Sequence, residues 1–362
     1  MSAALFLLIV LAMVLVFTYT NGFHDAANAI ATVVATKVLT PRQAVIWAAI
    51  FNFIGALGGT AVAKTVGAGL VDTTYVTLVT VLCAMLAGTT WNITTWYFGL
   101  PTSSSHSLIG GLIGAALASA KSWHVIKWSV AKTDPKTGHI VMDGLYPKVI
   151  IPMISSPIMG FVLGFLIMGL LFLVIRPMRP QFVNALFGRL QLISSTYMAW
   201  SHGFADGQKT MGVMALATFA ATQSGQLEHL PPWLQFLHTP KFEIATWVKW
   251  SCGLAMAFGT YIGGWKIIAT LARKLVSLKP VNGFAAETTA ATILLVTGRL
   301  GMPVSTTHCI TSSIMGVGCA KRFGAIDWVV VERILWAWVM TIPATGLLAY
   351  VCVRLMESLG VR

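Results

Sequence analysis

Charged residues are scarce in this chain. They make up 10% of its 362 residues, whereas an ordinary soluble domain contains about 25%. Acids are the scarcer sign, because 11 Asp and Glu stand against 24 Lys and Arg, which gives a formal charge of +13. Apolar residues reach 56%. This balance excludes a soluble enzyme and a disordered chain, and it indicates a multi-pass membrane protein.

Cysteine is too sparse to organise the fold. The five cysteines lie in apolar stretches and never form a CxxC pair, so we expect packed thiols rather than a disulfide framework or a metal site. No Lys or Arg precedes the first apolar run and no cleavage pattern follows it, so we expect no signal peptide. The basic residues lie between apolar runs, which favours lipid headgroups and an anionic substrate over nucleic acid as partners.

Long apolar runs dominate what is present. A bilayer core needs about 20 apolar residues per helix, and ten candidate segments lie at 3–36, 43–63, 75–98, 104–120, 149–175, 190–222, 245–271, 283–300, 304–320 and 329–353. Three polar stretches are expected to be loops, at 121–148, 176–189 and 223–243. The sequence therefore predicts an all-α polytopic membrane protein with about 10–12 helices, counting broken or re-entrant ones.

Two motifs each occur twice, in the same order. Residues 22–28 (GFHDAAN) align with 203–209 (GFADGQK), and 99–106 (GLPTSSSH) align with 301–308 (GMPVSTTH). Each half then holds five membrane segments, and because five is odd the second half must be inverted in the membrane. This pattern predicts two inverted repeats, over 1–175 and 190–362, joined by a short basic cytoplasmic connector over 176–189.

The distribution of basic residues bears on orientation. Each half has an odd number of membrane segments, so a connector inside the cell puts both termini outside. Basic residues near Lys37, Arg176 and Lys321 then face the cell interior, as the Lys/Arg bias prefers. The lysines of 121–148 then face outside, against that bias. We expect a multi-pass protein of the cell membrane (inner or plasma) with both termini outside.

The repeated hydroxyl runs are typical of helix starts. A Pro followed by Ser and Thr residues and an apolar stretch caps the free amides of a helix, and simple capping inside the membrane is one interpretation. Two copies in inverted halves would also bring two half-helix N-termini together near the midplane. Their amides and hydroxyls would form a cradle for a tetrahedral oxyanion, built from Ser103, Ser104, Ser105, Ser305, Thr306 and Thr307.

Two acids lie inside apolar segments. An ionised Asp25 or Asp206 is costly there and indicates a functional site, although an Asp that caps a broken helix is the alternative. Such a carboxylate could take up a proton, bind sodium, or accept a hydrogen bond from a protonated oxyanion. Phosphate carries protons near neutral pH and sulfate does not, so the last role favours phosphate.

Other polar residues in these segments leave alternatives open. Asn28 and Lys209 are equivalent in the repeat, and Lys209 could supply countercharge or extend to a helix end. Glu287 could belong to an ion site or form an interhelical hydrogen bond. His24 is adjacent to Asp25 and is the better candidate to titrate near pH 7, whereas the histidines at the ends of the hydroxyl runs could shuttle protons or cap helices.

Together these residues resemble the inorganic phosphate transporter (PiT) family. The resemblance rests on 22–29, 202–209, 283–287 and the two Pro-hydroxyl-His motifs, and it extends over nearly the whole chain. It implies symport of phosphate with protons or sodium, a homodimer, no cofactor, and phosphate held at the midplane between inverted repeats. It also implies that the hydroxyl runs and Gln208 contact phosphate, and that Asp25, Asn28 and Asp206 form the coupling site and could hold a sodium ion.

The chain departs from the family pattern at the coupling site. The common form is Gly-Ala-Asn-Asp in both halves, whereas this chain has His24 and Ala205 before its acids. Loss of two amide oxygens weakens a sodium site, and the first-half sequence Asn-Gly-Phe-His-Asp resembles the proton-coupled bacterial branch. We therefore expect proton-coupled phosphate symport, with Asp25, Asn28, Asp206, Glu287 and His24 as coupling residues.

Four alternatives remain from the sequence. Sodium-coupled phosphate symport, a permease for sulfate or another tetrahedral oxyanion, and a passive channel would each use the same anion cradle. An intramembrane hydrolase would use Ser105 or Thr307 with the adjacent His. It is disfavoured because neighbouring side chains on a helix do not face each other and no nucleophile elbow is present. We expect a transporter and not an enzyme.

Overall fold

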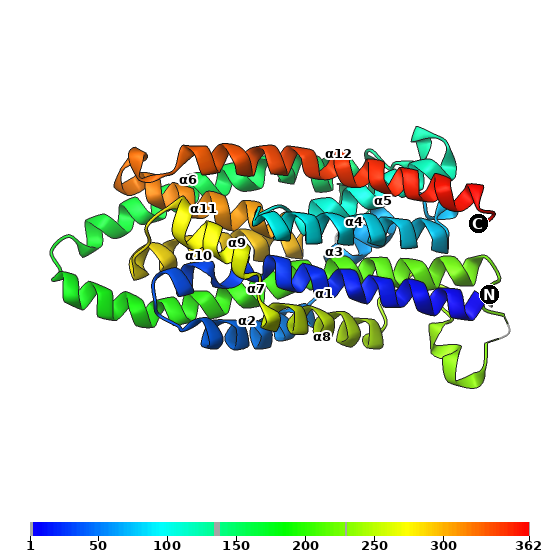
Figure 1. Cartoon of the computed structure of the whole chain (residues 1–362), viewed down its shortest axis with the longest axis horizontal. Helices are drawn as coiled ribbons and strands as arrows, with labels where there is room; N and C mark the ends of the chain where they lie inside the picture. Colours follow the sequence, from blue (N-terminus) through cyan, green and yellow to red (C-terminus); the bar gives the residue numbers. More distant parts are fainter. Residues whose placement is uncertain (1–2, 134–137, 229, 362) are drawn as a thin grey trace.

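Long helices run along one axis of the molecule (Figure 1). The structure is a computed structural model that describes residues 3–133, 138–228 and 230–361. The longest helices are α1 (Ala3–Ala35), α7 (Pro180–Gln223) and α12 (Trp328–Ser358). In Figure 1, α1 runs away from the end where both termini lie, and α7 runs back towards it. The two helices that carry the repeated Asp motif are therefore antiparallel.

Each of the ten predicted apolar segments contains a helix. In the first half these are α1, α2 (Pro41–Ala56), α3 (Ala61–Lys64) with the π-helix η1 (Thr65–Gly69), α4 (Leu78–Phe98), α5 (Ser104–Ala120) and α6 (Ile151–Ile175), which follows η4 (Tyr146–Ile150). In the second half they are α7, α8 (Thr246–Ile262), α9 (Trp265–Ala269) with η6 (Thr270–Leu275), α10 (Pro280–Arg299), α11 (Thr306–Lys321) and α12. Single 3₁₀ turns are η2 (Thr73–Tyr75), η3 (Trp123–Val125), η5 (Pro232–Leu237) and η7 (Phe323–Ala325).

The prediction that 176–189 is a loop is wrong. Helix α7 begins at Pro180, so only residues 176–179 separate it from α6. Proline suits the first helical position because its ring fixes φ near the helical value. Its missing backbone N–H costs nothing there, since that N–H would have no partner within the helix. Val183 and Phe187, one turn apart, are buried, and this apolar stripe continues the helix through a basic stretch.

The 121–148 stretch is also more ordered than a plain loop. Its strands β1 (Val130–Thr133) and β2 (Ile140–Asp143) form an antiparallel hairpin in which Val130 pairs with Asp143. The all-α prediction is confirmed for the membrane-embedded part of the chain, and this hairpin lies beyond the end of α5.

Several helices are suited to cross a bilayer. Within the described residues, α1, α4, the combined η4 and α6, and α12 are long and apolar enough to do so alone. Helix α2 together with α3 and η1 is also long and apolar enough, and the pair is bent by 67°, as in a broken span or a re-entrant loop. Helix α7 is long enough, but the polar motif at 201–209 lowers its hydropathy. The chain is a multi-pass membrane protein.

Helix packing in one half has a counterpart in the other. Helix α1 packs on α8 and α7 on α2, while α5 packs on α12 and α11 on α6. Gly22 lies against the backbone of Met256 on α8, and its equivalent Gly203 lies against the backbone of Asn52 on α2. A β-carbon at either glycine would overlap these backbone atoms. Each glycine thus brings its Asp motif close to a neighbouring helix.

Candidate functional site

The two hydroxyl runs meet at the centre of the molecule. Each begins a helix as predicted, because Ser103 Oγ accepts from His106 N and Ser305 Oγ accepts from His308 N, both at 3.1 Å. The imidazole rings of His106 and His308 are 4.6 Å apart between centroids. From this point α5 and α11 extend towards opposite ends of the molecule (Figure 1).

A left-handed glycine precedes each run. Gly99 ends α4 with φ 66°, and Gly301 follows α10 with φ 67°. Glycine adopts this backbone conformation without the steric cost that a β-carbon brings. The chain therefore leaves each helix, passes the proline and begins a new helix at the hydroxyl run.

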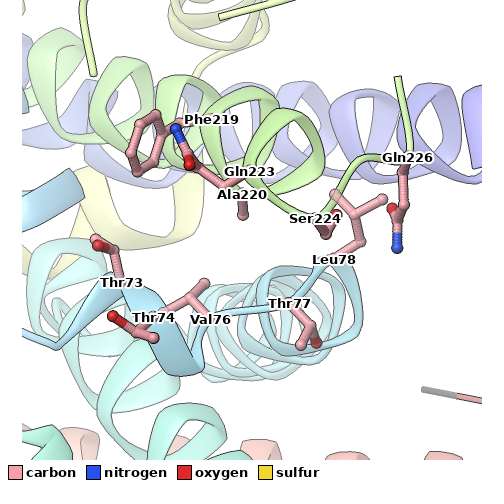
Figure 2. A pocket seen from close by; sticks show the side chains of 10 residues that line it. All are labelled: Thr73, Thr74, Val76, Thr77, Leu78, Phe219, Ala220, Gln223, Ser224 and Gln226. Atoms are coloured by element: carbon pink, nitrogen blue, oxygen red, sulfur yellow. The ribbon is translucent and has the colours of Figure 1, made fainter. Parts of the chain in front are cut away.

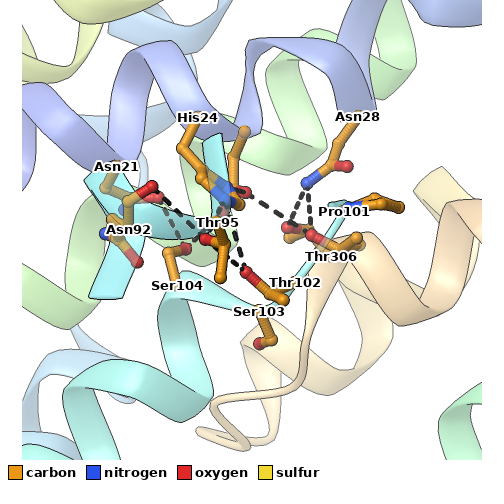
Figure 3. A network of polar contacts seen from close by, with 12 residues as sticks. Asn21, His24, Asn28, Asn92, Thr95, Pro101, Thr102, Ser103, Ser104 and Thr306 are labelled. Carbon is orange, nitrogen blue, oxygen red and sulfur yellow. Dashed lines mark hydrogen bonds and ion pairs between the residues drawn. The ribbon is translucent and has the colours of Figure 1, made fainter. Parts of the chain in front are cut away.

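Asp25 on α1 contacts one hydroxyl from each run. Figure 3 shows the neighbouring polar contacts of His24 and Asn28, which lie on the same helix. Ser104 donates to its Oδ2, and Thr307 Oγ1 lies 3.4 Å from its Oδ1. Asn28, one turn further along α1, donates from Nδ2 to Thr306 Oγ1 at 3.1 Å and to Thr307 Oγ1 at 2.9 Å. The first-half motif therefore contacts both hydroxyl runs. Asn21, which the sequence analysis did not single out, has its Oδ1 2.7 Å from Ser104 Oγ, where it competes with Asp25 for the one hydroxyl hydrogen.

His24 bridges Asp25 to two threonines. Its Nδ1 lies 2.8 Å from Asp25 Oδ1, and its Nε2 lies 3.1 Å from Thr95 Oγ1 and 3.3 Å from Thr102 Oγ1. Thr95 donates its hydrogen to Trp91 O, and Thr102 donates to Thr95. The two ring nitrogens of His24 are thus both engaged, and which of them donates depends on the tautomer.

The second Asp forms an ion pair inside the protein. Lys209 Nζ binds Asp206 Oδ1, and it also donates to Ser105 Oγ and, at 2.7 Å, to Val304 O. Thr306 donates to Asp206 Oδ2 at 3.0 Å. Lys209 is 2% exposed, so it does not extend to a helix end. The second-half motif thus contacts the first hydroxyl run, as the first-half motif contacts the second.

His202 completes this arrangement, and the sequence analysis did not select it. Its Nε2 lies 3.2 Å from Asp206 Oδ2, and its Nδ1 lies 3.1 Å from Asn52 Oδ1. Asp25, His202 and Asp206 each offer a ligand atom within 4.8 Å of the others. The i,i+4 spacing of His202 and Asp206 on one helix face was the available signal.

Two predicted residues lie apart from this cluster. Gln208 accepts from Val62 N at 2.9 Å and donates to Phe204 O at 2.6 Å, so it caps the start of α3 and is not brought to the hydroxyl runs. Glu287 accepts from Thr32 at 2.5 Å, from Gln191 at 3.0 Å and from Ser194. Thr32 is one turn beyond Asn28 on α1, so Glu287 belongs to a second, neighbouring polar cluster.

A polar cavity of about 490 Å³ lies elsewhere, between the start of α4 and the end of α7 (Figure 2). Thr74, Thr77 and Gln223 are among its lining residues. Phe219 in its wall is 13 residues from Asp206, about 20 Å along the helix. The lining includes none of the residues of the Asp25 and Asp206 cluster. That cluster is closed off by protein, since Asp25 is 1% and Asp206 0% exposed.

Comparison with known proteins identifies the fold and family. A model of the phosphate transporter family matches residues 21–349. The chain is 41% identical over 341 residues to a "probable low-affinity inorganic phosphate transporter" of Bacillus subtilis, covering 93% of both chains. It is 41% identical over 343 residues to the protein of the same description in Rhizobium meliloti, covering 94% of both.

A solved structure described as "The sodium-dependent phosphate transporter" shares the fold. Its TM-score is 0.79 at 21% identity, with 98% of this chain and 99% of that chain covered. These matches confirm the resemblance drawn from the motifs and the polytopic helical fold. They also rule out the hydrolase, because the family consists of transporters and not of enzymes. The chain belongs to the phosphate transporter family.

Proposed function

We propose that this protein takes up inorganic phosphate by symport with protons. The observation that carries the proposal is the contact between His24 and Asp25. The Nδ1 of His24 lies 2.8 Å from a carboxylate oxygen of Asp25, and both side chains are buried. A hydrogen bond between them needs a proton, carried either by the imidazole or by the carboxyl group. We propose that this pair takes up the coupling proton beside the hydroxyl runs.

The hydroxyl runs are proposed to bind the phosphate. Ser104, Ser105, Thr306 and Thr307 lie around the two acids, while Ser103 and Ser305 cap the helices that point their N-termini at the same place. Helix N-termini favour anions. The carboxylates can accept hydrogen bonds from a protonated oxyanion, which favours phosphate over sulfate. The relatives described as inorganic phosphate transporters support the same substrate.

Alternating access would expose this site to each side in turn. The site is buried in the structure, and the main helix contacts of one half have counterparts in the other. This packing supports two inverted repeats that move relative to each other around a central site. We further propose that the protein resides as a homodimer in the cell membrane with both termini outside.

Sodium coupling is the second candidate. The structural neighbour is described as sodium-dependent, and Asp25, His202 and Asp206 place ligand atoms within 4.8 Å of one another. Two features disfavour it here. The residue before Asp25 is His24, where the family's common form has an Asn whose amide oxygen could bind sodium. At Asp206, the ammonium of Lys209 already binds the carboxylate oxygen that sodium would need.

Uptake of labelled phosphate into proteoliposomes separates these candidates. An imposed pH gradient should drive accumulation in the wild type, and His24→Gln and Asp25→Asn should abolish that accumulation. His124→Gln alters an exposed histidine in η3 and is the matched control that should transport normally. Accumulation that requires sodium and ignores the pH gradient would refute proton coupling. Absence of phosphate uptake under both gradients would refute the substrate.

A further inference from the structure

Lys209 occupies the position that Asn28 holds in the other repeat. The two residues are the last of the aligned motifs at 22–28 and 203–209. Their polar groups contact opposite hydroxyl runs: Asn28 contacts Thr306 and Thr307, and Lys209 contacts Ser105. One repeat thus presents a neutral amide where the other presents a positive charge.

The ammonium of Lys209 is surrounded by oxygen atoms. Its three partners are the carboxylate of Asp206, the hydroxyl of Ser105 and the carbonyl of Val304. These are the classes of ligand that a hard metal cation selects. An ammonium group has three hydrogens and no acceptor, so three oxygens satisfy it fully. His202 and Thr306 contact the other carboxylate oxygen and complete the surroundings of Asp206.

No lysine in the described part of the chain contacts Asp25. Its partners among the described residues are His24, Ser104 and Thr307. Its counter-cation must therefore be an exchangeable ion, which in the proposed function is a proton shared with His24. Asp206, in contrast, is neutralised by a group that is covalently part of the chain.

We propose that Lys209 is a tethered cation that permanently fills the cation site of the second repeat. Asp25 is then left as the acid that binds an exchangeable coupling ion. This inference deepens the proposed function and rests on it for the identity of that ion. It implies that Lys209 is a specificity-determining residue, because its ammonium excludes free sodium from the oxygens around Asp206.

Sodium binding by purified Lys209→Asn tests the proposal without measuring transport. Removing the ammonium leaves a buried carboxylate, a hydroxyl and a carbonyl without their cation. The thermal midpoint is compared in sodium chloride and in choline chloride at equal ionic strength, without phosphate. We expect a sodium-dependent rise in Tm, saturable and about 3 °C or more above any rise in the wild type.

Two variants serve as controls, and a third repeats the test. Asp206→Asn combined with Lys209→Asn removes both charges and should lose the extra sodium effect. Lys64→Asn alters an exposed lysine of α3 and should behave like the wild type. Lys209→Gln retains a donor and is a second test if Lys209→Asn is hard to purify.

The outcomes are distinct. If the sodium-dependent rise in Tm is the same in Lys209→Asn, Lys209→Gln and the wild type, the tethered-cation proposal is overturned. Failure of both single variants to fold in sodium chloride as well as in choline chloride would also overturn it, because sodium is expected to replace the ammonium. Failure of the proposed function would appear separately, as absence of proton-driven phosphate uptake by the wild type.

Discussion

Asn28 and Thr307 are joined by a hydrogen bond of 2.9 Å, although 279 positions separate them in the chain. The Asn28 amide donates to the Thr307 hydroxyl, which in turn lies 3.4 Å from Asp25. The hydroxyl of α11 is therefore oriented by a helix of the other half. This contact links the proposed phosphate ligands of one repeat to the proposed coupling acid, Asp25, of the other.

Replacing Thr307 with Val should weaken phosphate transport. The substitution removes a hydroxyl of the proposed cradle and leaves the Asn28 amide with one acceptor fewer. A hydrogen bond to a charged group contributes about 1.5–3 kcal/mol, so we expect the transport efficiency for phosphate to fall about 10- to 100-fold. Initial uptake rates over a range of phosphate concentrations measure it.

Thr311 offers a matched control one turn further along α11. Its hydroxyl is buried and has no hydrogen-bond partner among the described residues. Thr311→Val changes the same atoms on the same helix and should leave phosphate uptake unchanged. Equal losses in both variants would show that packing of α11, and not the Thr307 hydroxyl, accounts for the effect.

The repeated motifs predicted much of this site, because each motif combines a helix start with a buried acid. The meeting of the hydroxyl runs with Asp25, Asn28 and Asp206 follows from the alignment of the two halves. His202 escaped prediction since it lies outside the aligned residues and its repeat equivalent is Asn21. Its role depends on Asp206 lying one turn away on the same helix face.

Rotation about the helix axis explains why neighbouring residues of α7 contact different elements. Gln208 is adjacent in sequence to Lys209, but its side chain projects to α3 while that of Lys209 projects to Ser105. The start of α7 at Pro180 was missed because prolines and arginines flank the short apolar stretch that contains Val183 and Phe187. Sequence order alone does not fix which face of a helix meets which neighbour.

Glu287→Gln should separate ion coupling from phosphate binding. The carboxylate accepts from Thr32, Gln191 and Ser194, none of which contacts the hydroxyl runs. If Glu287 takes part in coupling, gradient-driven accumulation should fall at least about 10-fold, which corresponds to about 1.4 kcal/mol. Exchange of internal for external phosphate, which needs no net ion flux, should persist.

Glu243→Gln is the control for Glu287→Gln, because Glu243 is exposed before α8. It should affect neither accumulation nor exchange. If Glu287→Gln loses exchange together with accumulation, the residue supports the fold by interhelical hydrogen bonds. If it loses neither, Glu287 has no part in coupling.

Sulfate should compete poorly with phosphate. Both anions are tetrahedral and both suit the hydroxyls of Ser104 and Thr306. Sulfate lacks a proton near neutral pH, so its oxygens would face the carboxylates of Asp25 and Asp206 without a donor between them. We expect a 100-fold excess of sulfate to leave the initial rate of labelled phosphate uptake nearly unchanged, and an equal excess of unlabelled phosphate to suppress it. Equal suppression by both anions would indicate a general oxyanion permease.

Gln208→Ala should affect stability more than substrate affinity. The Gln208 side chain accepts from the buried amide of Val62 and donates to Phe204 O, and among the described residues it has no hydrogen bond to the hydroxyl runs. Leaving a buried amide without its acceptor costs about 1–3 kcal/mol, which lowers the thermal midpoint of the purified protein. The phosphate concentration for half-maximal uptake should change by less than about twofold. A large increase in that concentration with an unchanged Tm would instead indicate that Gln208 contacts phosphate, as the family resemblance implies. In that case α3 would have to move away from Gln208 during transport.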